Sequence, residues 1–174
     1  MAQNFRPGLQ EIQSILDPLM AWNWNLLIPL IPGTADTRQI SYKVLSTSIP
    51  GSQLEQVPLE THGVKLNFAG RRVWSGTWNA TLVETRTTST RDSLLKWMEL
   101  ARSWVGNSGS YKSVYGVTAE LQIFDDLPQI VRSIRLYGLF PTQIDDASLE
   151  QSSSIVQYSC TFSYDFTEEF TGSE

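Results

Sequence analysis

Few side chains in this chain have the potential for catalysis or metal binding. They are the single histidine His62, the single cysteine Cys160 and the aspartate pairs at 125–126 and 145–146. A histidine can serve as a general base, and paired carboxylates can transfer protons or bind a hard cation. His62 lies in "ETHGV", however, where His followed by Gly is typical of a turn between two strands. The turn is therefore the favoured interpretation of His62.

The remaining candidates also have structural explanations. Both aspartate pairs follow an expected strand, which favours solvated turns over a metal or acid–base site. Cys160 alternates with Tyr158 and Phe162, so we expect a small core residue rather than a nucleophile. The chain contains no Gly-x-Ser-x-Gly elbow, His-Glu-x-x-His motif or phosphate-binding loop. We expect no catalytic residue, no cofactor and no metal.

Composition limits the classes of protein to which the chain can belong. A length of 174 residues with 41% hydrophobic content predicts one domain, residues 1–174, with one core. A net charge of −5 argues against a sequence-specific DNA-binding protein. The most apolar stretch, residues 26–32, is interrupted by Pro29 and Pro32 and is too short to span a membrane. The beginning of the chain lacks the pattern of a signal peptide.

Alternation of apolar and polar residues dominates the sequence and predicts strands. Trp78, Ala80 and Leu82 share one face of such a strand, and the same pattern recurs around residues 117–124 and 155–166. Shorter runs begin near residues 22, 40, 53, 63 and 130. About eight strands in one domain predict a mainly β fold, an antiparallel barrel or sandwich.

One segment, residues 89–105, has the periodicity of a helix instead. Its apolar residues recur at steps of three and four, which predicts a stripe packed against the sheet: Leu94, Trp97, Met98, Ala101 and Trp104. Ser89 and Asp92 predict a capping box at its start, and Gly106 predicts its end.

Residues 51–73 predict a long hairpin around the turn at residues 61–63. Its strands are apolar at intervals but its charged termini make it a poor core element. The apolar residues are Leu54, Val57, Leu59, Val64, Leu66 and Phe68.

The order of several short motifs is more specific than any one of them. The motifs are Pro50, Glu55 with Pro58, residues 67–70 ("NFAG"), Trp78, Trp97 and residues 138–142 ("GLFPT"). In this order, from about Trp22 to Glu169, the chain resembles the tail tube proteins of contractile-tailed bacteriophages, which are related to the tube proteins of type VI secretion.

This resemblance implies a structural protein of the virion, assembled in the host cytoplasm. Hexameric rings would stack into a tube through which DNA is ejected, and a contractile sheath would surround it. The implied partners are further copies of the chain, the tail sheath protein, and baseplate and tail terminator or neck proteins. A tape measure protein or DNA would fill the lumen without sequence-specific binding, and no membrane is involved. The hairpin would reach the next ring, with residues 1–21 as an N-terminal arm and 165–174 as a C-terminal tail.

The polar faces of three expected strands are the candidates for the wall of such a tube. Their apolar faces are needed for the core, so we expect nine residues to face the lumen: Thr77, Asn79, Thr81, Thr118, Glu120, Gln122, Gln157, Ser159 and Thr161. A wall without cations would not hold the phosphate backbone and would let DNA slide.

Three other interpretations remain open. The chain could form the inner tube of a type VI secretion or extracellular contractile injection system. A small-ligand-binding barrel would need an apolar cavity. A hydrolase would have to depend on His62.

Overall fold

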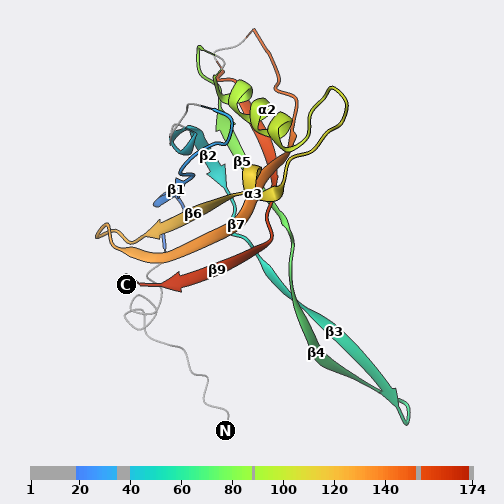
Figure 1. Ribbon diagram of the computed structural model, residues 1–174. Helices are drawn as coiled ribbons and strands as arrows, with labels where there is room; N and C mark the ends of the chain where they lie inside the picture. The colour runs from blue at the N-terminus through green and yellow to red at the C-terminus, as the bar shows by residue number, and fades with distance from the viewer. Residues whose placement is uncertain (1–18, 35–39, 88, 152–153, 173–174) are drawn as a thin grey trace.

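Strands make up about half of the described chain (Figure 1). The computed structural model describes residues 19–34, 40–87, 89–151 and 154–172. The strands are β1 Trp24–Leu27, β2 Val44–Thr47, β3 Ser52–Thr61, β4 Val64–Trp74, β5 Thr77–Val83, β6 Val117–Phe124, β7 Ile130–Ile144, β8 Gln157–Ser163 and β9 Phe166–Thr171. The helical elements are η1 Ser41–Lys43, α2 Ser89–Ala101 and α3 Lys112–Tyr115. The predicted mainly β, antiparallel fold is confirmed.

Seven strands form one antiparallel sheet in the order β1-β6-β7-β8-β5-β2, and β9 also pairs with β7. The sheet is folded over at β7. The first part of β7 pairs with β6 and β9, whereas residues 140–144 pair with β8. We call β1, β6, the first part of β7 and β9 sheet A, and the last part of β7 with β8, β5 and β2 sheet B. The strands of the two sheets cross each other in Figure 1, as in an orthogonal sandwich.

The bend in β7 lies at Gly138, whose φ of +66° is a conformation that glycine adopts without strain. A Cβ atom at this position would collide with the carboxylate of Asp165. Asp165 forms an ion pair with Lys112 of α3, and its backbone N–H donates to the carbonyl of Tyr137 at 2.9 Å. The bend is therefore fixed from both α3 and the turn between β8 and β9.

The core lies between the two sheets and under α2. Trp78 and Leu82 of β5 face Leu121 of β6, and the ring of Phe162 contacts Trp78 at a centroid distance of 5.6 Å. The burial of β5 alternates along the strand, as the sequence pattern predicts. Cys160 is also a buried core residue, as expected.

Helix α2 buries only the first part of its predicted stripe. Leu94 and Trp97 are fully buried, and Trp97 Nε1 donates to the carbonyl of Tyr115 at 2.7 Å. Met98 and Ala101 are partly buried. The prediction for Trp104 is wrong, since its side chain is 71% exposed.

The physical reason is that the helix ends at Ala101 and not near residue 105. An isolated β-bridge joins Arg102 to Gly109, and the Ser103 N–H donates to the Ser108 carbonyl at 2.9 Å. Gly106 and Asn107 adopt positive φ angles inside the loop so closed. Trp104 therefore lies on the outer turn of an ordered loop.

The start of α2 is capped by Glu84, the residue directly after β5, and not by the predicted Ser89–Asp92 box. The Glu84 carboxylate accepts hydrogen bonds from the backbone N–H groups of Thr90 and Arg91, both at 3.1 Å. Burial raises the pKa of Glu84, but these backbone donors together with that of Thr85 outweigh it, so the pKa lies below its ordinary value. Ser89 instead accepts a hydrogen bond from Lys43 Nζ at 2.7 Å.

The two ends of the chain differ in how much of each the structure describes. Residues 165–174, expected as a tail, contain strand β9, whose six residues pair with residues 132–137 of β7. The predicted arm, residues 1–21, lies mostly outside the described residues, which begin at Leu19. Within the described ranges, no helix is long and apolar enough to cross a membrane.

The two tryptophans of the α2 region provide a matched pair of stability tests. We expect Trp97→Ala to lower the free energy of unfolding by roughly 3 to 5 kcal/mol, because it leaves a cavity between α2 and Phe162. Trp104→Ala should change it by less than about 0.5 kcal/mol. Urea denaturation of both variants measures the difference, and similar losses in the two would contradict the position of Trp104.

The Glu84 cap predicts a pH-dependent stability. Glu84→Gln should cost roughly 1 kcal/mol at pH 7, as loss of a charged helix cap does. Because the folded-state pKa is lowered, this contribution is present above the ordinary value of 4.5 and disappears as the pH falls through the folded-state value. The gap in unfolding free energy between the wild type and the variant should therefore shrink between about pH 6 and pH 3. A gap that stays constant over this range would rule out the cap.

Candidate functional site

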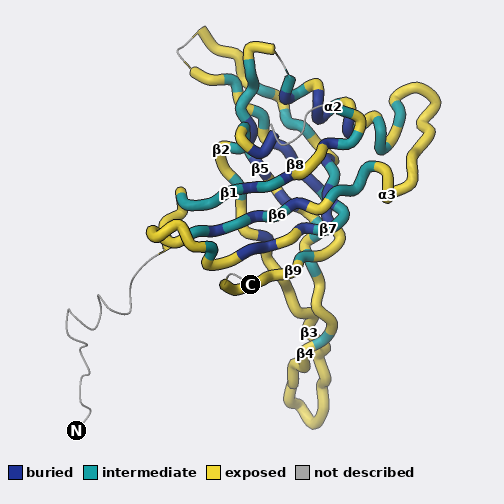
Figure 2. Tube along the Cα trace, turned by 60° about the vertical axis from the view of Figure 1, so that its left-hand side comes forward, coloured by how far each residue is buried: buried dark blue, intermediate teal, exposed yellow. Residues whose placement is uncertain are grey.

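The hairpin β3–β4 leaves the body of the molecule, and none of the other described strands pairs with it (Figure 1, lower right). Every residue of β3 is exposed, and the hairpin is exposed along almost its whole length in Figure 2. Its turn consists of His62 and Gly63, with φ angles of +49° and +74°. Two positive φ angles are typical of the two-residue turns that join twisted strands. The predicted turn is confirmed, and His62 contacts Thr61 Oγ1 through Nδ1 at 2.8 Å.

One face of the hairpin carries an unpaired apolar stripe. Strand alternation and cross-strand pairing place Val57 opposite Phe68 and Leu59 opposite Leu66, with Val64 beside them. We call these five residues the apolar stripe; their exposed fractions lie between 44% and 56%.

Leu54, predicted with this set, lies on the opposite face. The reason is local: Leu54 is an odd number of residues from Val57 and Leu59, and it pairs with Arg72. A bulge at Gly70 and Arg71, opposite Glu55, gives Arg72 the same face as Leu54. A Cβ atom on Gly70 would lie 3.0 Å from the Glu55 backbone oxygen, so glycine fits the bulge better than a residue with a side chain.

An isolated two-stranded hairpin is only marginally stable in water, and an exposed apolar stripe usually marks an interaction surface. Within this subunit, the stripe stays exposed. The hairpin is therefore the strongest candidate for a binding surface.

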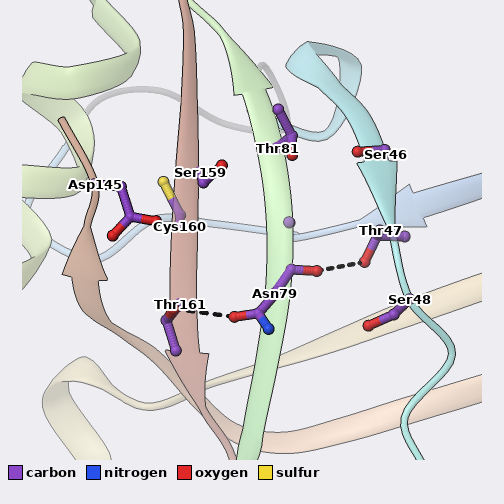
Figure 3. Close-up of a pocket in the computed structure, with 10 residues that line it drawn as sticks. Ser46, Thr47, Ser48, Asn79, Thr81, Asp145, Ser159, Cys160 and Thr161 are labelled. Atoms are coloured by element: carbon purple, nitrogen blue, oxygen red, sulfur yellow. Dashed lines mark hydrogen bonds between the residues drawn. The ribbon is translucent and has the colours of Figure 1, made fainter. Parts of the chain in front are cut away.

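The outer face of sheet B is a hydroxyl- and amide-rich surface (Figure 3). It carries six of the nine residues predicted to face a lumen: Thr77, Asn79, Thr81, Gln157, Ser159 and Thr161. Thr161 Oγ1 donates to Asn79 Oδ1 at 3.0 Å, and Thr47 Oγ1 donates to the Asn79 carbonyl at 3.1 Å. An open depression of about 550 Å³ lies here, and Asp145 is the one charged residue in its lining.

The other three predicted residues, Thr118, Glu120 and Gln122, lie on the outer face of sheet A. In Figure 3 strands of sheet A cross behind sheet B, so the two outer faces point in opposite directions. The nine residues therefore do not form one continuous surface of the subunit. The cause is the sandwich: both sheets turn their apolar faces to the shared core, and their polar faces are directed away from each other.

Glu120 belongs to a network on that second face. Its carboxylate accepts hydrogen bonds from Gln122 Nε2 at 2.8 Å and Ser133 Oγ at 2.7 Å, and it pairs with Arg135 at 3.3 Å. Burial raises its pKa, but these partners outweigh it and hold the pKa below the ordinary value. Arg135 also lies 4.7 Å from the ring centroid of Phe170.

The predicted chemical candidates do not come together. Burial, with a smaller contribution from Asp145, raises the pKa of the Cys160 thiol to about 12, which makes it a poor nucleophile. The Asp126 N–H donates to Asp125 Oδ1 at 2.7 Å, as in a turn. Among the residues that the structure describes, no group of three or more metal-ligating side chains occurs.

A second exposed surface lies at the end of the molecule opposite the hairpin, and the sequence pattern does not mark it. Residues 145–151 form this end, at the top of Figure 1, and expose Leu149 beside Asp146 and Glu150. No periodic pattern marks such a segment, so only its position in the fold distinguishes it.

Comparison with known proteins gives a consistent result. No family model matches the chain. It is 24% identical to the tail tube protein gp19 of Enterobacteria phage T4 over 136 residues, which are 75% of this chain and 82% of that protein. In fold it is similar to a chain of the PVC sheath–tube complex of an extracellular contractile injection system, with a TM-score of 0.62, 10% identity, and 95% and 99% of the two chains covered. It is also similar to a chain of the tube-terminating cap of the anti-feeding prophage, with a TM-score of 0.66, 12% identity, and 99% and 100% covered.

Proposed function

We infer from its homology to gp19 of phage T4 that this chain is a tail tube protein of a contractile-tailed phage, a structural component of the virion tail. The similarity to gp19 along 82% of that protein's length is the observation that carries this conclusion. The crossed sheets and the similarity in fold to a sheath–tube complex agree with it. Since these relatives are structural proteins, they give no support to the hydrolase hypothesis for His62.

The assembly follows from this function. Copies of the chain form rings that stack into a tube, with a sheath around the tube and cap and baseplate proteins at its ends. The relatives in fold support this, since they come from a sheath–tube complex, a terminating cap and a baseplate. A six-membered ring, and a tape measure protein or DNA in the lumen, complete the proposed assembly.

In this assembly the hairpin β3–β4 makes the contact between successive rings. It projects far from the body of the described subunit, and its apolar stripe is exposed in the single chain. Burial of the stripe on a second copy would stabilise both the hairpin and the stack, at about 25 cal/mol for each Å² of apolar surface. The hairpin of one copy would bind a different surface on the next copy. Such a contact does not close into a two-fold dimer and can repeat along a tube.

The hairpin can be tested without unfolding the subunit. We expect the triple variant Leu59→Ser, Leu66→Ser and Phe68→Ser to keep its melting temperature within a few degrees, since the stripe is exposed, but to form no tubes. Replacing residues 53–71 by a short Gly-Ser linker should have the same effect. Electron micrographs of the purified proteins provide the measurement.

The control is a double variant on the opposite face of the hairpin, Gln56→Ser and Asn67→Ser, which should form tubes like the wild type. Tubes of normal length from the stripe variant would show that the hairpin does not join the rings.

We assign the lumen to the outer face of sheet B. The hairpin continues the β2–β5 pair, separated from it by only residues 48–51 and 75–76, so these strands run in the direction of stacking. The six predicted residues on this face carry no charge, whereas the outer face of sheet A contains Glu120 and Arg135. A surface without cations releases no counterions from DNA and does not retain it.

A pair of threonine variants tests the assignment. In phage assembled with Thr77→Lys, on the outer face of sheet B, DNA ejection should slow by roughly tenfold at low salt and recover at high salt, because each ring gains phosphate contacts. The matched variant Thr118→Lys, on sheet A, should eject DNA at the wild-type rate. If Thr118→Lys slowed DNA ejection and Thr77→Lys did not, the lumen would lie at sheet A.

An injection machine is the second candidate function. The similarity in fold to a chain of the PVC sheath–tube complex favours it, and at 10% identity this similarity establishes only the fold. Purified particles distinguish the two: a phage tail joins a DNA-filled head, and an injection machine does not.

A further inference from the structure

Two exposed features of the subunit lie outside the apolar stripe and are not part of the ring contact proposed for it. The first, which we call the root patch, consists of Leu54 and Arg72, directly opposite each other where the hairpin leaves the body. The second, which we call the far-end segment, is residues 145–151. Figures 1 and 2 place the hairpin at one end of the molecule, and Figure 1 places the far-end segment at the other.

The root patch is apolar and positively charged. Leu54 is 60% exposed and lies on the face of the hairpin away from the apolar stripe. The neighbouring Arg71 pairs with Glu55 at 3.2 Å, whereas the part of the chain that the structure describes offers Arg72 no ion pair. Strand β4 carries Lys65, Arg71 and Arg72 and no acid, in a chain of net charge −5.

The far-end segment is apolar and negatively charged. Leu149 is 82% exposed, and Asp146 and Glu150 are exposed on either side of it. The segment "DDASLEQ" contains no basic residue. Asp145 already accepts a hydrogen bond from Gln143 at 2.6 Å, so Asp146 and Glu150 are the charges available to a partner.

We propose that the root patch of one copy docks on the far-end segment of a copy in the next ring, with Leu54 against Leu149 and Arg72 beside Glu150 and Asp146. This rests on the proposed function, in which hairpins point along the stack. A hairpin directed at the next ring brings its root to the opposite end of that ring's subunits. The two surfaces match in both respects, apolar against apolar and base against acid, and such matching selects the register of a contact.

A disulfide cross-link tests the contact directly. In assembled tubes, Leu54→Cys combined with Leu149→Cys should give a ladder of covalent oligomers on a non-reducing gel after mild oxidation. A disulfide forms only where two Cα atoms approach to about 4.4–6.8 Å. The native Cys160 is buried and should contribute no bands. The matched control pairs Leu54→Cys with Leu127→Cys, which is similarly exposed on the β6–β7 turn and should give no ladder.

A charge exchange provides the second test, in case the cysteine variants do not assemble. Arg72→Glu should raise the protein concentration needed for tube formation at least about tenfold, because every subunit of a ring repeats the lost contact. Glu150→Arg should do the same, and the two changes together should return it to within about threefold of wild type, as coupled residues do. Glu99→Arg, an equal charge change on the exposed face of α2, should have little effect.

The outcomes separate this inference from the proposed function. Tubes without the cross-link, or Arg72→Glu and Glu150→Arg effects that simply add, would overturn the docking of these two surfaces while ring stacking stands. Failure of the unmodified protein to form rings or tubes, alone or on purified baseplates, would overturn the proposed function itself.

Discussion

Strand β7 belongs to two sheets, and the structure depends on the bend that makes this possible. At Gly138 the backbone takes a positive φ and leaves no space for a side chain beside Asp165. The ion pair between Lys112 and Asp165 ties α3 to the bend, and Lys112 Nζ lies 5.7 Å from the ring centroid of Phe140 just beyond it. A straight β7 would extend one flat sheet and leave its apolar face in water.

Because β7 bends, both sheets bury their apolar faces against each other. The polar faces of the sheets and the hairpin are directed away from this core. Two polar faces then point in opposite directions, which allows one to line a lumen while the other meets different surroundings. The hairpin continues the β2–β5 pair beyond the body, where no core is left to cover it. A subunit built in this way has an exposed apolar stripe at one end, and in the proposed stack a neighbouring copy would cover it.

Local patterns explain which parts of this could be predicted from the sequence. Alternation along β5 and the spacing of Leu94 and Trp97 report the burial of each face directly, so these elements were predicted correctly. The turn at His62 and Gly63 was predicted because a residue followed by Gly between two strands is typical of a turn. In the structure both residues adopt the positive φ angles that such a turn needs.

The errors arise where distant residues decide the structure. Trp104 continues the helical spacing, but the Arg102–Gly109 bridge diverts the chain before it. The helix cap comes from Glu84, several residues before the helix begins. Thr81 and Glu120 look alike as polar residues on alternating strands, and only the topology shows that they lie on opposite surfaces. Periodicity reveals which face of a strand is polar but not where that face points.

Hydrogen–deuterium exchange of the hairpin amides, compared between isolated subunits and assembled tubes, tests the central claim most directly. The account predicts that amides of residues 52–74 exchange rapidly in the subunit, like those of other marginal two-stranded hairpins, and become strongly protected in the tube. Amides of the core strand β5 should be protected in both states. Equal, rapid exchange of the hairpin amides in subunits and in well-formed tubes would contradict the account, because the hairpin would then have no partner in the stack.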